Sequence, residues 1–130
     1  MGRDAFRLAA EAGDMDALAA ALDQEVHFRG PAFGTADVVG RERVMGILKI
    51  AFDKVYRDFS YVESLDNGDR CVLLFTSQVG EHAIEGAQVL RFGDHDLVVE
   101  LAVMARPAPG AAAIGEEIVR HLDFDPREEG

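Results

Sequence analysis

Apolar residues in the first part of the chain follow the spacing of helices. A first short helix is predicted over 5–12, with Asp4 as its N-cap and Gly13 at its left-handed end. Asp14 caps a second short helix. The apolar positions of this second helix share one face, and they are Met15, Leu18, Ala19 and Leu22.

A short strand and a longer helix follow. Residues 25–29 alternate between apolar and polar side chains, which predicts a strand, and Gly30-Pro31 ends it. The stretch 33–40 has no clear period and is predicted to be a loop that rims a site. A third helix is predicted over 41–55. Its apolar stripe consists of Val44, Ile47, Leu48, Ala51, Phe52 and Val55.

From position 57 onward the period changes to two, which is typical of strands. The strands are predicted over 57–65, 70–79, 83–92 and 97–106. A tight hairpin turn at Asn67-Gly68 joins the first two, because this pair adopts positive φ at little cost. Gly86 predicts a bend or a bulge in the third of these strands.

The end of the chain is predicted to be helical. Pro107 and Pro109 break the preceding strand, and a last helix is expected over 111–122. Its apolar positions are Ile114, Ile118 and Leu122. The acidic tail beyond this helix is expected to be mobile.

This order of elements predicts an α+β fold. A meander of long antiparallel strands twists and bends, so it wraps around the N-terminal helices as a half-open cone. The closed end of the cone forms the core, and the open end forms an apolar pocket. A single domain is predicted over 1–130, in which 110–130 supply a C-terminal helix and an acidic tail.

Charge and composition narrow the range of partners. The chain has 24 acidic and 13 basic residues, a net charge of −11, which disfavours nucleic acids and anionic membranes. The lone Cys71 allows no internal disulfide. No apolar stretch is long enough to span a membrane, and charged residues interrupt the N-terminus, so a cytoplasmic location is predicted. The histidines lack metal-ligand spacing and no dinucleotide fingerprint occurs, so neither a metal nor a cofactor is expected.

Four segments of the chain together resemble the NTF2-like superfamily, and within it the SnoaL-like group. They are Phe6-Arg-Leu-Ala-Ala-Glu-Ala-Gly-Asp-Met-Asp-Ala-Leu18, Val26-His-Phe-Arg-Gly-Pro31, Gly40-Arg-Glu-Arg-Val44 and Gln88-Val-Leu-Arg-Phe-Gly-Asp-His-Asp-Leu-Val-Val-Glu100. The resemblance extends over about residues 4–107. It implies a cystatin-like cone. It does not select an activity, because this superfamily includes isomerases, cyclases, hydrolases, dehydratases and non-catalytic binding modules.

The acid/base groups of ketosteroid-isomerase-like members are missing at the matching positions. The resemblance places Phe6 at their tyrosine, Gly30 at their base aspartate and Gln88 at their protonated aspartate. A phenyl ring and a glycine can neither give nor take a proton. The Asp-Arg-Asp set of epoxide-hydrolase-like members and the aspartate of SnoaL-like cyclases are not found either. Whether the chain is an enzyme stays open.

Gln88 is the most informative candidate for the pocket. It shares a strand face with apolar neighbours, so its amide is predicted to be either a core group bonded to the backbone or a ligand-facing anchor. Tyr61 is either a core aromatic residue or a second polar group of the pocket. The expected ligand-binding residues are Gln88, Tyr61, Phe6, Ile47, Leu90, Leu101 and Val103.

Glu63 is the candidate general base, because on an alternating strand it lies on the face of Tyr61. If that face is solvated, Glu63 is an ordinary surface acid. Two functions therefore remain. One is a SnoaL-like protein that binds a small, mostly apolar organic molecule in the cone-shaped pocket and acts on it as an isomerase- or cyclase-type enzyme using general acid/base catalysis. The other is a non-catalytic ligand-binding or dimerisation module.

The last predicted strand is apolar on both faces. Val98, Ala102 and Met104 alternate with Val99, Leu101 and Val103. One face is expected to line the cone. The other is expected to be covered by a second copy of the chain, which predicts a homodimer through the outer face of the sheet.

Overall fold

The computed structural model describes residues 2–31 and 37–124. Two short helices, α1 (Ala5–Ala12) and α2 (Met15–Ala20), precede strand β1 (Leu22–Arg29). Asp14 caps α2 by accepting a hydrogen bond from the backbone N–H of Ala17 at 3.0 Å, as its position predicts. β1 is longer than predicted, and Leu22 opens this strand rather than closing the apolar face of α2.

The third helix has the predicted limits but changes its winding. It consists of α3 (Arg41–Ile50) and the π-helical turn η1 (Ala51–Val55). A two-residue strand, β2 (Val38–Val39), occupies part of the predicted loop, and the rest of that loop, residues 32–36, lies outside the described residues.

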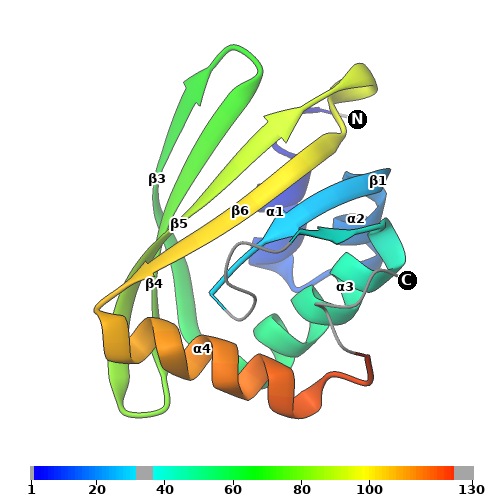
Figure 1. Ribbon diagram of the computed structural model, residues 1–130. Coiled ribbons are helices and arrows are strands. Elements are labelled where there is room, and N and C mark those ends of the chain that lie inside the picture. The colour runs from blue at the N-terminus through cyan, green and yellow to red at the C-terminus, as the bar shows by residue number, and fades with distance from the viewer. Residues whose placement is uncertain (1, 32–36, 125–130) are drawn as a thin grey trace.

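Four long strands follow: β3 (Arg57–Asn67), β4 (Arg70–Val79), β5 (His82–Phe92) and β6 (Val98–Arg106). A short 3₁₀ turn, η2 (Asp94–Asp96), separates β5 from β6. The strands in the described residues form one curved, six-stranded sheet in the order β2-β1-β6-β5-β4-β3 (Figure 1). The predicted meander of β3 to β6 is antiparallel throughout, as is the pair of β1 with β2. β1 pairs with β6 in parallel, a pairing that the sequence did not predict.

The last helix, α4 (Ala108–His121), begins earlier than predicted. Pro109 lies in its first turn, where a proline is tolerated because the missing N–H has no intrahelical partner there. α4 runs across one end of the long strands (Figure 1). Gly110 allows this contact, because a Cβ there would lie 2.4 Å from Cγ2 of Ile84. The tail predicted to be mobile falls largely on residues 125–130, outside the described part of the chain.

The core lies between the inner face of the sheet and the helices. Side chains that are almost fully buried come from α1, α2, α3, β1, β4, β5, β6 and α4. The largest are Phe6, Phe75, Leu18, Leu22, Ile47, Leu73, Leu90, Leu101 and Ile114. The predicted α+β architecture is therefore confirmed.

Candidate functional site

The edge strand β3 departs twice from regular pairing with β4. Arg57 pairs with Gln78 but Ser60 pairs with Thr76, and a second shift follows Tyr61. Each shift inserts one extra residue in β3, and bulges of this kind re-aim the neighbouring side chains. Between the two bulges, the aromatic rings of β3 turn toward the inner side of the sheet.

Those rings belong to an aromatic cluster centred on Phe59. The ring of Phe59 stacks on the buried Phe75, with centroids 4.8 Å apart and planes 24° apart. Phe52 and Tyr61 stand nearly perpendicular to it, at 79° and 89°, with centroid distances of 5.1 and 4.9 Å. Tyr56 completes the cluster at 5.2 Å and 50°. η1 supplies Phe52, Tyr56 follows it, and β3 supplies Phe59 and Tyr61, so two elements build one aromatic wall.

The structure brings Tyr61 and Gln88 together, as the predicted site requires. The Tyr61 hydroxyl donates a hydrogen bond to Oε1 of Gln88 at 2.6 Å. Gln88 is only 1% exposed, and every buried side-chain nitrogen and oxygen in the described residues has a partner. The amide of Gln88 is thus held by a side chain from the neighbouring aromatic wall.

Both tyrosines remain protonated over a wide pH range. Burial raises the pKa of the Tyr61 phenol well above its usual range, and the negative potentials of Tyr56 and Glu11 add to this shift. Burial also raises the pKa of Tyr56 well above its usual range. The Tyr61 hydroxyl is therefore a lasting hydrogen-bond donor rather than a phenolate.

A cleft of about 540 Å³ opens against this aromatic wall. Its lining residues are Ala10, Glu11, Ala12, Gly13, Phe52, Tyr56, Phe59, Ser60 and Tyr61. A second hollow of about 420 Å³ shares Gly13 and Phe52 with it and extends to Met15, Lys49 and Asp53. We call the first of these the aromatic cleft. Its aromatic side chains are all half-buried, so they present ring surface to whatever enters.

The predicted pocket walls lie deeper than this cleft. Phe6, Ile47, Leu90 and Leu101 are no more than 1% exposed and pack into the core. They line neither the aromatic cleft nor the other cavities described for this chain. Val103, in contrast, borders a separate cavity of about 490 Å³ between β6 and the start of α4. Of the predicted ligand-binding residues, Tyr61 is the one that reaches the aromatic cleft.

Glu63 does not face the pocket. The bulge after Tyr61 reverses the alternation of β3, so Tyr61 pairs with the inward Phe75 whereas Glu63 pairs with the outward-facing Leu74. Glu63 is exposed. The prediction that these two residues share one face is wrong, because it assumed an uninterrupted strand.

A family model for the SnoaL-like domain matches residues 3–101. The chain belongs to the SnoaL-like family. No curated protein matches it. Its fold is NTF2-like, a curved open sheet with helices on its inner side, as the similar solved structures below also show.

A steroid delta-isomerase from Pseudomonas aeruginosa is 32% identical, with a TM-score of 0.82, over 88% of this chain and 84% of that chain. An uncharacterised protein with a cystatin-like fold from Silicibacter pomeroyi is 22% identical, with a TM-score of 0.82 over 89% and 81% of the two chains. An NTF2-like protein of unknown function from Cytophaga hutchinsonii is 17% identical, with a TM-score of 0.63 over 81% and 87%.

The positions that the family resemblance implies for acid/base groups hold no such groups in this SnoaL-like chain. Gly30 lines the cavity of about 490 Å³ that Val103 borders, but it supplies no side chain there. Gly30 is buried, and a Cβ there would lie 2.8 Å from the ring of Phe28, so that ring would have to move to admit a carboxylate. Phe6 is 1% exposed and packs into the core. Within 2–31 and 37–124, no three His, Cys, Asp or Glu side chains are arranged to hold a metal ion. None of the described helices has the length and apolar character to cross a membrane.

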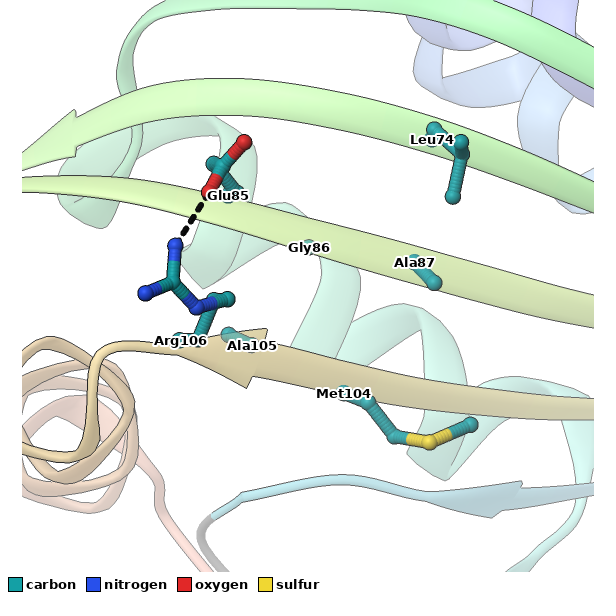
Figure 2. A pocket seen from close by; sticks show the side chains of 7 residues that line it. All are labelled: Leu74, Glu85, Gly86, Ala87, Met104, Ala105 and Arg106. Atoms are coloured by element: carbon teal, nitrogen blue, oxygen red, sulfur yellow. Dashed lines mark hydrogen bonds and ion pairs between the residues drawn. The ribbon is translucent and has the colours of Figure 1, made fainter.

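The outer face of the sheet carries two apolar rows across its strands. Paired positions place Leu74, Ala87 and Met104 in one row and Leu65, Val72, Val89 and Ala102 in the next. Charged pairs border these rows, Glu85 with Arg106 on one side and Arg91 with Glu100 on the other. Figure 2 shows the Glu85–Arg106 pair beside a shallow hollow of about 350 Å³ on this face.

Strand β6 differs from its predicted pattern at one residue. A register shift places Val98 opposite the buried Phe92, so Val98 lies on the inner side with Leu101 and Val103. The prediction that Val98 shares the outer stripe with Ala102 and Met104 is therefore wrong.

Some of the cleft was accessible to sequence reasoning. Phe59 and Tyr61 alternate on one predicted strand face, and Phe52 lies in the apolar stripe of the third helix. Tyr56 lies next to that helix, and nothing in the local sequence indicated that it lines a cleft. Glu11, on a helix of the first segment, is brought to the cleft by the tertiary fold alone.

Proposed function

We propose that this SnoaL-like chain binds a small, mostly apolar organic molecule in the aromatic cleft. The observation that carries the proposal is that half-buried aromatic side chains line one cleft together with a residue whose polar group has a fixed orientation. Phe52, Tyr56, Phe59 and Tyr61 line one cleft, and the Tyr61 hydroxyl is held on Gln88 at 2.6 Å. Ligand pockets are typically apolar hollows with a few oriented polar groups, and this cleft has that composition.

The position of the cleft also supports binding at the mouth of the cone rather than in its interior. The predicted interior walls Ile47, Leu90 and Leu101 are packed into the core, so a ligand there would have to displace side chains. At the edge strand β3 no such displacement is needed. The polar anchor that we assign to the ligand is the Tyr61–Gln88 pair, with Tyr61 reaching the cleft.

Intrinsic fluorescence tests this proposal. The chain has two tyrosines and no tryptophan, and both tyrosines line the aromatic cleft. Titration with 2-decalone, an uncharged bicyclic ketone, is expected to change tyrosine emission to saturation. Ala12→Leu fills the cleft and is expected to abolish the change. Ala20→Leu, at an exposed alanine outside the cleft, is the matched control.

Two results would overturn the proposal. One is an emission that does not saturate with 2-decalone or with other uncharged ketones of similar size. The other is an equal response of Ala12→Leu and Ala20→Leu, which would place the bound molecule elsewhere.

A second candidate is general acid/base chemistry in the same cleft. The 32% identity to a steroid delta-isomerase favours it, and Glu11 supplies a carboxylate on the cleft that Tyr61 also lines. Glu11 would take the proton from the carbon between the carbonyl and the alkene and return it to the far alkene carbon. Tyr61 would donate to the developing oxyanion only if its hydroxyl turned away from Gln88, to which it donates in the structure. If this candidate holds, 3-cyclohexen-1-one is converted to its conjugated isomer faster than in buffer, seen as rising ultraviolet absorbance. Glu11→Gln would remove that acceleration. If the wild-type protein does not accelerate this reaction, the catalytic candidate is overturned and only the binding role remains.

We also propose that two copies pair through the apolar rows of the outer face. Both charge signs occur along each border, so a two-fold axis can bring opposite charges together around an apolar centre. Met104, 56% exposed, lies in one of these rows. Met104→Glu is expected to convert a dimer to a monomer in light scattering at micromolar concentration. Val119→Glu, on the exposed side of α4, is expected to leave it dimeric. A monomeric wild-type protein would overturn this proposal.

A further inference from the structure

We infer that the molecule bound in the aromatic cleft carries a positive charge, as a substituted ammonium group attached to a compact apolar body. The inference rests on the proposed function, because it names the class of ligand that the same cleft takes. It comes from the orientation of the rings and from the charge of the lining.

The rings of the cleft approach from several directions. Relative to Phe59, the planes of Phe52 and Tyr61 are rotated by 79° and 89°, and that of Tyr56 by 50°. Phe59 itself is stacked on Phe75 by one face. The other rings therefore surround Phe59 instead of extending its stack. These rings contact one another at centroid distances of 4.9 to 5.7 Å, so a cation would lie against the ring faces that border the cleft and not between the rings. Aromatic faces attract a cation through their quadrupole.

The charge of the cleft lining has one sign. Of the residues that line the aromatic cleft, Glu11 is the charged one, and it is a carboxylate. Arg7 donates to its Oε1 at 3.0 Å, and among the described residues no donor is bonded to its Oε2. Arg7 offsets part of the charge of Glu11, but Arg7 does not line the cleft. An ammonium group would therefore meet the second carboxylate oxygen together with aromatic faces.

The adjoining hollow does not reverse this sign. It contributes Asp53 together with Lys49, so the lining of both hollows combined is two acids against one base. The net charge of −11 for the whole chain acts in the same direction at long range. Charge complementarity therefore favours an organic cation over an anion.

A cation and an uncharged molecule of the same shape separate this inference from simple apolar binding. Benzyltrimethylammonium and neopentylbenzene differ in one atom, nitrogen against carbon. Moving an ammonium group out of water costs more than moving its carbon counterpart, so a merely apolar cleft would favour neopentylbenzene. A preference for the cation must come from the rings and the carboxylate.

The experiment titrates both molecules against tyrosine emission of the full chain at low salt. The cation is expected to bind about tenfold more tightly. Glu11→Gln is expected to reduce this preference by about threefold or more. The matched control is Asp16→Asn, which removes the same charge from an exposed position on α2 that lines neither hollow, and is expected to keep the preference.

The outcomes separate the two proposals. Equal or tighter binding of neopentylbenzene overturns the inference of a cationic ligand and leaves the proposed binding function intact. Equal loss of preference in Glu11→Gln and Asp16→Asn also overturns it, because net charge would then explain the effect. Binding of neither molecule, nor of 2-decalone, overturns both proposals.

Discussion

The inner faces of β5 and β3 have a similar apolar alternation in the sequence, but they have different roles in the structure. On β5 the pairing with β4 is uninterrupted, and Ile84, Gln88, Leu90 and Phe92 are all buried. On β3 two bulges interrupt the pairing, and the inward rings are only half-buried. One strand completes the core, and the other forms the wall of a cleft.

The difference shows that cavity position depends on strand regularity as well as on hydrophobicity. An uninterrupted strand presents its whole inner face to the helices, which fill the space beside it. A bulged edge strand turns away locally, and its side chains meet the solvent at the mouth of the cone. Substitutions on the two strands should therefore affect different properties of the protein.

The largest effect is expected in the filled region. Leu90→Ala removes a side chain of β5 that is 1% exposed, and its lost burial and the residual cavity should lower the free energy of unfolding by about 2–5 kcal/mol. Leu65→Ala on β3, where the side chain is 50% exposed, should change it by about 0.5 kcal/mol or less. Urea denaturation measures both. Similar values for the two variants would contradict the difference between the strands.

A smaller loss of stability is expected where the filled core at β5 meets the cleft wall at β3. At Gly86 the pairing with both neighbouring strands is regular, so the strand has no bulge there, and the glycine leaves room for a ring. A Cβ there would lie 2.3 Å from Cζ of Phe75 and 2.8 Å from the carbonyl oxygen of Met104. Gly86→Ala should therefore destabilise the fold by about 1–3 kcal/mol in urea denaturation.

Gly86→Ala should also disturb the cleft, because Phe75 supports the ring of Phe59. Weaker binding of 2-decalone is expected in this variant. Ala83→Ser, at an exposed position of the same strand, should change neither stability nor binding. Unchanged stability in Gly86→Ala would mean that Phe75 is free to move.

The bond that joins the two strands should have a modest energy. Tyr61→Phe removes the hydroxyl that donates to Gln88 and should lower the free energy of unfolding by about 1 kcal/mol. Combined with Gln88→Leu in a double-mutant cycle, the coupling energy should also be about 1 kcal/mol. Additive effects of the two substitutions, measured by urea denaturation, would show that the side chains do not interact.

A further effect is expected at high pH. The raised pKa of both Tyr56 and Tyr61 means that the folded protein keeps phenol protons that the unfolded chain loses near pH 10. Stability contributed by these groups is complete below pH 10 and falls as the pH rises above it. At pH 11 the folded protein should show little tyrosinate absorbance at about 295 nm, whereas the chain in denaturant should show it fully. Equal absorbance in both states would place the tyrosines in open solvent.

Much of the fold could be predicted from the periods of the sequence. The strand limits of β4 and β5 follow from alternation and turn residues, and Asn67-Gly68 marks the hairpin between β3 and β4. Tyr61 and Gln88 could be selected as polar residues in apolar surroundings. Register shifts could not be predicted, because they depend on cross-strand pairing and not on the local sequence. Those shifts moved Glu63 outward and Val98 inward.

The cleft could not be predicted from local sequence patterns for a similar reason. Glu11 belongs to α1 and Phe52 to η1, and the tertiary fold brings both beside β3. The parallel pairing of β1 with β6 is likewise a contact between segments distant in the sequence. Whether the interior of the cone is filled depends on side-chain packing, and the periodicity of the sequence does not reveal this packing.

The location of the bound ligand tests this account most directly. Incorporation of 3-fluorotyrosine gives one fluorine signal each for Tyr56 and Tyr61, assigned with Tyr→Phe variants, while labelled methyl groups of Ile47, Leu90 and Leu101 report on the interior. On addition of 2-decalone or benzyltrimethylammonium, both fluorine signals are predicted to shift to saturation, with the interior methyl signals nearly unmoved. Saturable shifts of the interior methyl groups with unmoved fluorine signals would contradict a cleft at the β3 edge.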